Sequence, residues 1–300
     1  MKPKQDIRQG DKWTEYLGRK GWESHRINNR ANILYKRTFL GSVVKIQHPP
    51  LLKKEDLEEI EAFCKSKGAM FIKIESFIGQ ETSIFKDFGY IHSTVPNLPT
   101  SSMYIDLTLS EKDLWNKVSK SGKYSIRRAR REGAVVEYFQ NPTKDMLEDY
   151  YKIVKETGKK KHFYIPPYKD FLDKLEIFGN DCHILLSRNK KGIITGGKMC
   201  LCHKDMVLYT TGGTTEIGRK GKSGYELTWK SFLYFKKLGY KIFDLEGVDD
   251  DRFPEATKKW GGFSYFKEKF GGEIIRFPYP QIKYLSLSLR LLSKIYTIPF

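Results

Sequence analysis

At 300 residues the chain is long enough for two domains of ordinary size, each with its own core. Hydrophobic residues make up 39% and aromatic residues 14%, which excludes a disordered basic protein. The formal net charge of +18 favours an anionic partner such as RNA, a nucleotide-linked substrate or an acidic membrane face. A solubilising surface is the alternative reading of this charge.

The cysteines and the N-terminus indicate the compartment. Cys200 and Cys202 share one face of an alternating strand, and neither Cys64 nor Cys182 completes a zinc site with them. We therefore expect reduced thiols and no metal. The first residues lack the apolar core of a signal peptide, and no window is long enough to span a membrane, so we expect a cytoplasmic protein.

Apolar periodicity, glycines and turn residues predict alternating strands and helices throughout the chain. In the first half of the chain they are a helix at residues 13–17, strands at 23–27, 31–39 and 42–46, a helix at 54–66, and strands at 69–74 and 103–107. A helix at 117–131, a strand at 134–140 and a helix at 143–157 follow. The last elements are strands at 183–188, 193–203 and 206–211, a helix at 222–237 and a strand at 240–245. This order predicts an α/β (α+β) protein.

Two segments of the chain resemble each other. When Gly68 is aligned with Gly239, 239 − 68 = 171 residues later, KGAMFIKIE lies over LGYKIFDLE. Further on, residues 85–89 (FKDFG) echo residues 266–271 (FKEKFG). A helix, a glycine, a buried strand and an aromatic turn thus occur twice in the same order. We interpret the chain as two tandem copies of one α/β unit.

The second copy carries the strongest candidate site. Asp244 and Glu246 stand at the carboxyl end of a predicted strand, where sites on open α/β sheets usually lie. Lys267 follows Phe266 and precedes a Phe-Gly-Gly turn. Carboxylates at a strand end that face a fixed lysine are suited to holding and polarising a charged acyl donor.

This stretch resembles the Fem family of peptidoglycan-bridge aminoacyltransferases, in which a D-x-x-G strand end precedes an F-K-x-x-F-G-G turn. The matching positions are Asp244, Gly247, Phe266, Lys267, Phe270, Gly271 and Gly272. Residues 104–133 and 156–175 also resemble family patterns, with Lys123 at a position where the family usually has arginine. The resemblance implies two tandem GNAT-like acyltransferase domains. We place the boundary near Asn141, giving domains of residues 1–141 and 142–300.

The resemblance also implies an activity. The donor would be an aminoacyl-tRNA, and the acceptor an amine on the stem peptide of a UDP-linked or lipid-linked peptidoglycan precursor, with no cofactor. Some members of the family carry a helical arm, but no heptads here are long enough for a coiled coil. We expect a monomer. An N-acyltransferase that uses acyl-CoA is the alternative enzyme, and a basic RNA- or membrane-binding protein without catalysis is the alternative from another class.

The resemblance places Phe266 and Lys267 in the active site. Lys267 would orient the donor or stabilise the oxyanion. The alternative is a surface lysine flanked by core aromatics, and the presence of Lys86 at the echo position in the first copy supports this alternative. Asp244 is our candidate general base, with Glu246 beside it for substrate binding. A structural carboxylate paired with a local arginine is the alternative for either acid.

The loop GGTTEIGRKGKSG is a candidate anion site. It is not a phosphate-binding loop of the P-loop type, because Glu216 occupies the position of the required first glycine. The free amides at the following helix start would lie near the basic and hydroxyl side chains of Arg219, Lys220, Lys222 and Ser223. The resemblance assigns Arg219 to the precursor diphosphate, and a purely structural loop is the alternative. Tyr209 would line the substrate channel or simply pack.

Between residues 117 and 131 the chain has seven basic residues and no acid. We expect Lys123, Arg127 and Arg128 of this helix to bind tRNA or a precursor phosphate. The alternative is a solvated helix.

The C-terminus predicts one amphipathic helix. Its apolar stripe consists of Ile282, Leu285, Leu289, Leu292 and Tyr296, widened by Leu291 and Ile295. The basic residues Lys283, Arg290 and Lys294 share the far side. We expect the helix to dock on the protein and to leave its basic edge towards anionic lipid, which would give peripheral contact with the membrane.

Overall fold

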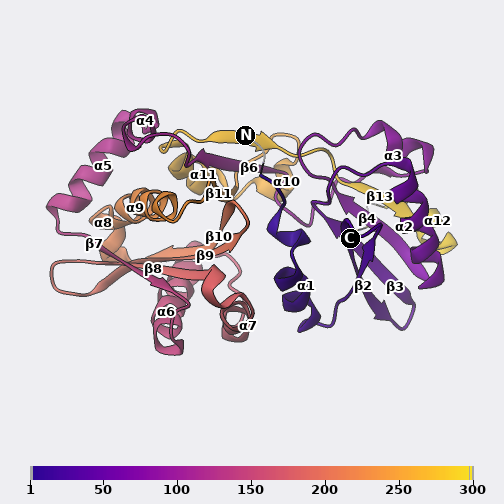
Figure 1. Ribbon diagram of the computed structural model, residues 1–300, viewed down its shortest axis with the longest axis horizontal. Coiled ribbons are helices and arrows are strands. Elements are labelled where there is room, and N and C mark those ends of the chain that lie inside the picture. The colour runs from indigo at the N-terminus through magenta and orange to yellow at the C-terminus, as the bar shows by residue number, and fades with distance from the viewer. Residues whose placement is uncertain (1–2, 297, 299–300) are drawn as a thin grey trace.

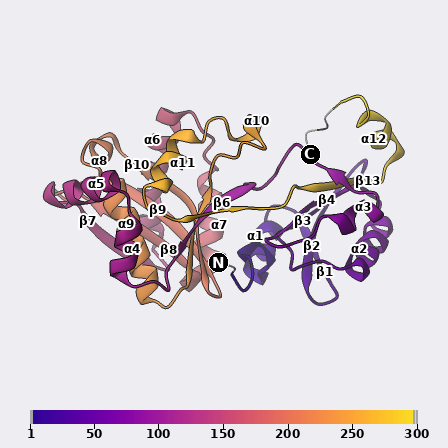
Figure 2. The same ribbon diagram turned by 90° about the horizontal axis from the view of Figure 1, so that it is seen from above.

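The computed structural model describes residues 3–296 and 298. Figure 1 shows two lobes side by side along the longest axis, each built around its own sheet. Figure 2 shows the same division from above, with the C-terminal strand β13 in the lobe that contains the N-terminal strands. No helix among the described residues is sufficiently long and apolar to cross a bilayer.

The first lobe contains a six-stranded sheet. Its strands in spatial order are β1 (Glu23–Ile27), β2 (Ala31–Thr38), β3 (Gly41–Gln47), β4 (Ala69–Glu75), β13 (Gln281–Tyr284) and β5 (Ile91–His92). Asn28 and Asn29 connect β1 to β2 with φ of 46° and 53°, the left-handed backbone that tight hairpin turns require, and the predicted strands on either side are confirmed. Helix α2 (Lys54–Ser66) supplies Leu57, Ile60 and Cys64 to the core of this lobe.

The second lobe contains a seven-stranded sheet. Its strands in spatial order are β12 (Glu273–Arg276), β6 (Ser101–Asp106), β11 (Ile242–Gly247), β10 (Met206–Thr214), β9 (Ile194–His203), β8 (Cys182–Arg188) and β7 (Val135–Gln140). Helices α6 (Lys144–Lys161) and α7 (Tyr168–Phe178) cover one face, and α5 (Lys120–Arg131) and α9 (Ser223–Lys237) cover the other (Figure 1). Ile184 and Leu185 pack on opposite faces because side chains alternate along a strand.

The remaining elements are short. They are η1 (Ile7–Gln9), α1 (Asp11–Gly18), α3 (Ser83–Asp87), α4 (Glu111–Lys117), η2 (Gly179–Asp181), α8 (Glu216–Lys220), α10 (Pro254–Thr257), α11 (Gly261–Glu268) and α12 (Leu287–Leu292). The part of the chain that the structure describes contains no coiled-coil arm (Figures 1 and 2).

The internal repeat corresponds to a repeat in space. Strand β4 follows α2 and pairs in parallel with β3 and antiparallel with β13. Strand β11 follows α9 and pairs in parallel with β10 and antiparallel with β6. The two aligned strands therefore hold equivalent positions in their sheets, as two copies of one unit require.

The chain does not pass from one sheet to the other at the expected boundary near Asn141. The chain leaves the first sheet after β5 and enters the second at β6, and it returns to the first sheet with β13. Asn141 directly follows β7, the edge strand of the second sheet, so residues 101–140 lie in the second lobe. The local pattern predicts strands, but the choice of sheet depends on distant hydrogen-bonding partners.

The predicted C-terminal helix is wrong over its first residues. Residues 281–284 form β13, because the exposed backbone edges of β4 and β5 pair with them on both sides. Ile282 is buried in this ladder, and Lys283 pairs with Glu61 Oε1 at 2.5 Å, so neither belongs to a helix surface. Only α12 is helical, and it starts at Leu287.

Candidate active site

The second sheet opens where β10 and β11 separate. Their parallel pairing ends at Leu208 and Asp244, and β10 has a bulge between Tyr209 and Thr211. In the first sheet the equivalent strands stay paired as far as Gln47 and Glu75. Bulges and interrupted ladders are common beside active sites because they expose backbone and redirect side chains. The second lobe thus offers an opening at the carboxyl end of β11 that the first lobe lacks.

Lys267 lies at this opening. Its side chain is buried, and Nζ donates hydrogen bonds to Gly247 O at 2.6 Å and Glu246 O at 3.2 Å. Burial lowers its pKa to about 8, although the nearby carboxylates of Glu246 and Asp244 favour the charged form. An ammonium has three donors, so one N–H of Lys267 is not used by these carbonyls. Its echo Lys86 is exposed, so the surface-lysine alternative fits Lys86 and not Lys267.

The Phe-Gly-Gly turn fixes the helix that carries Lys267. Gly271 has φ of 69°, and a Cβ at this position would lie 2.2 Å from Lys117 O. Phe270 is buried and packs edge-on against Phe266 at 5.3 Å between ring centroids. Phe266 therefore has a packing role in the described structure, and the turn leaves no room for a larger residue at Gly271.

The two carboxylates at the end of β11 are held differently. Asp244 is 2% exposed, and its Oδ1 accepts hydrogen bonds from Ser102 Oγ and, at 2.6 Å, from Glu246 N. Burial raises the pKa of Asp244 to about 7 despite these hydrogen bonds. Glu246 has φ of 58°, in the left-handed region, and its side chain is partly exposed. Desolvation raises the pKa of Glu246, and Arg8 and Lys267 oppose this effect.

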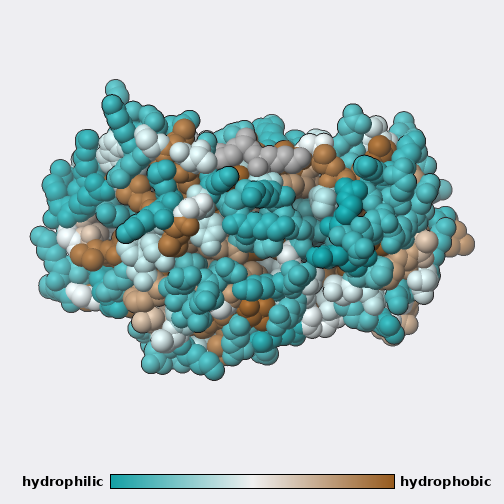
Figure 3. All heavy atoms as spheres, in the orientation of Figure 1, coloured by the Kyte–Doolittle hydropathy of each residue, from teal (hydrophilic) through white to brown (hydrophobic). Residues whose placement is uncertain are grey.

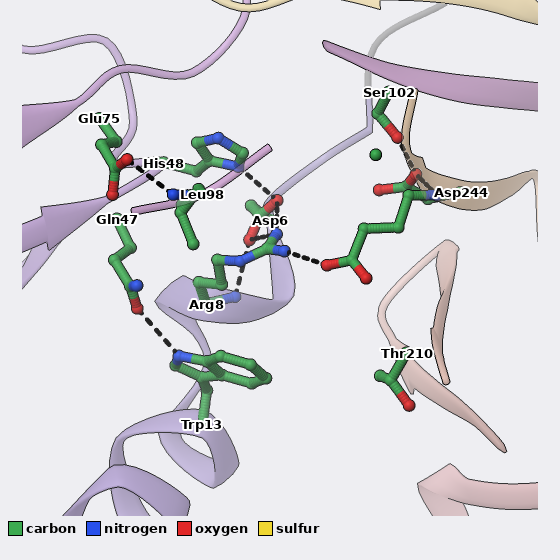
Figure 4. A network of polar contacts seen from close by, with 12 residues as sticks. Asp6, Arg8, Trp13, Gln47, His48, Glu75, Leu98, Ser102, Thr210 and Asp244 are labelled. Atoms are coloured by element: carbon green, nitrogen blue, oxygen red, sulfur yellow. Dashed lines mark hydrogen bonds and ion pairs between the residues drawn. The ribbon is translucent and has the colours of Figure 1, made fainter. Parts of the chain in front are cut away.

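Arg8 of η1 joins the site from the N-terminal segment, as Figure 4 shows. Its Nη2 lies 2.8 Å from Glu246 Oε1, and its Nη1 lies 3.1 Å from Asp6 Oδ2. His48, at the end of β3, contacts Asp6 through Nδ1 at 2.9 Å. Burial opposes ionisation of Asp6, but Arg8 and His48 outweigh it and hold the Asp6 pKa well below its usual range. This network links the first lobe to the candidate site.

The sequence pattern did not single out Arg8. Glu246 does pair with an arginine, but this partner stands 238 residues away, so the expectation of a local arginine is wrong. The only signal in the sequence is an acid two residues before an arginine in a polar N-terminus, which is too common to identify a site.

Lys198 is a second residue that sequence reasoning missed. It is 3% exposed, and its Nζ lies 3.5 Å from the centroid of the Tyr209 ring, with no ion-pair or hydrogen-bond partner among the described residues. Burial, together with the charge of Lys267, lowers its pKa to about 7. Tyr209 lies at the bulge of β10 and packs against the core of the second lobe. A lysine that alternates with Cys200 and Cys202 in a buried strand was the available signal.

The predicted anion loop lies farther along β10. Thr214 at its end is six residues beyond Leu208, or about 20 Å of strand. Arg219 Nη1 donates to Thr214 O at 2.5 Å, and its Nη2 is buried without a partner among the described residues. The structure therefore does not bring Arg219 together with Lys267, but it leaves Arg219 with unused donors.

Of the other predicted loop residues, Lys220 and Ser223 make local contacts. Lys220 pairs with Glu216 at 3.3 Å, and the buried Ser223 donates to Thr195 O at 3.5 Å. Lys222 has φ of 59° and precedes the first residue of α9. Of this group, Arg219 and Lys222 remain the basic residues without an acidic partner in the described chain.

The basic helix α5 begins beside the site. Ser119 N donates to Lys269 O at 2.9 Å, so the start of α5 lies against the turn that follows Lys267. Lys123 and Arg127 lie 5.9 and 5.7 Å from the Trp115 ring. Arg128 instead pairs with Glu132 at 2.7 Å. The structure thus brings Lys123 and Arg127 to one aromatic surface near the site and leaves Arg128 in an ion pair.

Neither metal ligands nor a deep cavity mark another centre in residues 3–296 and 298. No group of three or more His, Cys, Asp or Glu side chains in this part of the chain is placed to hold a metal ion. A depression of about 480 Å³ lies between α6 and α8, lined by Asp149, Glu156 and Glu216 among others, away from Lys267.

One family model and several solved structures match this chain. Residues 85–190 match the model of the FemAB family, and the chain matches no curated protein sequence. The crystal structure of FemX superposes with a TM-score of 0.81 at 16% identity, covering 96% of this chain and 94% of FemX. L-PGS from Bacillus licheniformis superposes with a TM-score of 0.65 at 16% identity, covering 96% and 91%.

A tandem GNAT protein from the clavulanic acid biosynthesis pathway gives a TM-score of 0.50 at 9% identity, covering 94% of this chain and 96% of that protein. The predicted fold class, two tandem GNAT-like domains without a coiled-coil arm, is confirmed. FemX and L-PGS share this fold over nearly the whole chain, whereas the FemAB model matches residues 85–190 alone. The chain thus has the fold of the Fem-type aminoacyltransferases, and its residues 85–190 carry the sequence pattern of the FemAB family.

Proposed function

We propose that this protein transfers an amino acid from aminoacyl-tRNA to an amine on the stem peptide of a peptidoglycan precursor. The observation that carries the proposal is Lys267, a buried ammonium that caps the carbonyls at the end of β11 within a Fem-type fold. A fixed positive charge in a poorly solvated position is suited to an ester carbonyl that becomes an oxyanion.

The reaction is an aminolysis. The acceptor amine attacks the ester carbon, the unused N–H of Lys267 stabilises the oxyanion, and the carbon–oxygen bond to the tRNA ribose then breaks. The attacking nitrogen passes its proton to Asp244, whose pKa of about 7 suits a base at neutral pH. Asp244 then gives this proton to the leaving ribose oxygen, which restores the hydroxyl, so the protein ends the cycle unchanged.

The placement of the basic groups supports an extended acceptor and a nucleic-acid donor. Arg219, about 20 Å of strand from Asp244, is our candidate for the precursor diphosphate, because its Nη2 has no partner in the described chain. Lys123 and Arg127 lie on α5 beside Trp115 and would contact the tRNA phosphates. Tyr209 and Glu246 would line the path between these two groups.

The test is a transfer assay with the purified full chain. We expect label from an amino acid esterified to tRNA to appear on a UDP-linked or lipid-linked stem peptide, identified by mass. Acyl-CoA serves as the competing donor in a parallel reaction. Transfer from acyl-CoA and not from aminoacyl-tRNA would replace the proposed donor. If neither donor supports transfer and the Lys267→Met variant binds tRNA as the parent does, the result would favour a non-catalytic binding protein.

We also propose a monomer that works in the cytoplasm, where both substrates are made. Sedimentation of the purified chain checks the first point, and a mass of two copies would contradict it.

A further inference from the structure

An exposed apolar surface lies at one end of the first lobe, outside the candidate active site. We call it the lobe-end patch; it consists of Phe39, Leu40, Leu287, Leu291, Ile295 and Tyr296. Phe39 is 96% exposed and Ile295 is 74% exposed. Large apolar side chains in such exposed positions are costly to a monomer in water and typically mark an interaction surface.

Two segments far apart in the sequence build the patch. The turn from β2 to β3 carries Phe39 and Leu40, and it packs on Met70, whose Cγ lies 2.8 Å from the position of a Cβ on Gly41. The chain that enters α12 is fixed to the same residue, because Ser286 N donates to Met70 O at 3.0 Å. Strands β3 and β13 flank β4 on either side, so the points at which the two segments join the sheet are about 10 Å apart.

The surroundings of the patch are basic. The cations at this end of the sheet are Arg37, Lys65, Lys67, Arg290 and Lys294. Of these, Arg37 pairs with Glu23, whereas the terminal nitrogens of Lys65 and Lys294 have no ion-pair partner in the described chain. Figure 3 shows brown apolar atoms projecting at the right edge, where Figure 1 places α12, among hydrophilic neighbours.

We propose that the lobe-end patch binds the surface of an anionic phospholipid bilayer. Two short apolar projections surrounded by lysine and arginine can insert side chains below the headgroups while the cations meet lipid phosphates. A nucleic acid can stack a base on Phe39, but the aliphatic side chains of Leu40, Leu291 and Ile295 offer neither a stacking surface nor a hydrogen bond to a base. The combination of exposed apolar and basic residues therefore favours the bilayer.

The proposal replaces the expected amphipathic helix with a different surface. Lys283 is excluded from it by its ion pair with Glu61, and Phe39 and Leu40 are added to it by the fold. The proposal is independent of the donor and acceptor of the reaction, because the patch lies in the lobe opposite Lys267.

The test is flotation of the full chain with vesicles of phosphatidylcholine, with or without about one third phosphatidylglycerol. We expect recovery with the anionic vesicles only. The variants Phe39→Ser/Leu40→Ser and Lys65→Gln/Lys294→Gln should each lower the partition coefficient by about tenfold or more. The matched control is Ile193→Ser in the second lobe, which removes an exposed apolar residue beside Lys190 and Lys191 and should float as the parent does.

Circular dichroism and thermal unfolding check that each variant is folded, as expected for substitutions at exposed positions. Equal recovery with neutral and anionic vesicles would overturn the proposal, as would parental flotation of the Phe39→Ser/Leu40→Ser variant. A parent that is dimeric without lipid and monomeric after this double change would assign the patch to a second copy of the chain. Weaker tRNA binding by the same variant, with unchanged flotation, would assign it to nucleic acid.

Discussion

Arg8 Nη2 and Glu246 Oε1 lie 2.8 Å apart although 238 residues separate them in the sequence. Arg8 is 3% exposed and its guanidinium also contacts Asp6, so one cation pairs with two carboxylates at the meeting point of the lobes. Burial disfavours the charge of Arg8, but Asp6 and Glu246 outweigh this and raise its pKa. The N-terminal segment is therefore part of the site and not an independent extension.

Arg8→Met should destabilise the protein by about 3–5 kcal/mol, because it leaves Asp6 and Glu246 without their shared cation. Urea unfolding at neutral pH measures the change. Arg37→Met is the control, since Arg37 pairs with Glu23 on the surface and should contribute under about 1 kcal/mol. An Arg8→Met protein as stable as the Arg37→Met protein would show that the buried pair is not needed.

Lys267→Met should lower the rate of amino-acid transfer by about a hundredfold or more in a protein that still folds. The loss follows from removal of a preorganised charge beside the ester carbonyl. Some loss of stability is also expected, because the carbonyls of Glu246 and Gly247 lose their donor. The rate is therefore measured well below the melting temperature of the variant.

Lys86→Met is the matched control, because Lys86 occupies the echo position in the first copy and is exposed. It should transfer at the parental rate. A folded Lys267→Met protein with near-parental turnover would remove Lys267 from the mechanism.

Asp244→Asn should stabilise the protein at pH 8 while it lowers the rate of transfer. The pKa of Asp244 is raised to about 7 by burial, so the folded state binds its proton more tightly than the unfolded state does. Its ionisation therefore costs stability as pH rises from about 4 to 7, by up to about 4 kcal/mol in total. Asparagine keeps an oxygen for Ser102 Oγ and Glu246 N and does not ionise.

The stability difference between Asp244→Asn and the parent should be small near pH 4, grow to pH 7 and stay constant above it. Urea unfolding across this range measures it. A difference that does not change with pH would mean that Asp244 is not the raised carboxyl.

Lys198→Met should show the opposite pH dependence. Burial lowers the pKa of Lys198 to about 7, so the parent loses stability as pH falls from about 10.5 to 7, by about 1.4 kcal/mol per unit at most. The stabilisation by methionine should therefore be larger at pH 7 than at pH 10. The exposed Lys191→Met serves as control and should show no such trend. Equal stabilisation at both pH values would contradict the lowered pKa.

The combined change Lys123→Gln/Arg127→Gln should weaken tRNA binding and reduce the dependence of log K on log salt by about one unit per lost phosphate contact. Filter binding at several salt concentrations measures both effects. Arg128→Gln should change the slope less, because Arg128 already pairs with Glu132. Equal slopes for the parent and the double variant would show that the tRNA does not contact this face of α5.

The sequence by itself determined the local elements of this protein. Helix α9 ends at Lys237 as the pattern indicates, and Gly239 after it has a left-handed backbone with φ of 88°, which glycine adopts without strain. The repeat of a glycine, a buried strand and an aromatic turn is also real, because β4 and β11 hold equivalent positions. These features are readable because backbone conformation and apolar periodicity depend on residues within one or two turns of chain.

Only the tertiary structure decided which distant residues meet. It assigned residues 281–284 to a strand in the first sheet, where open backbone edges on both sides outweighed a helical apolar stripe. It buried Lys198 and Lys267 together and joined Arg8 to Glu246, and these contacts set the ionisation of the candidate site. Burial and charge pairing depend on neighbours in space, so residue types and their spacing could name Lys267 but not its environment.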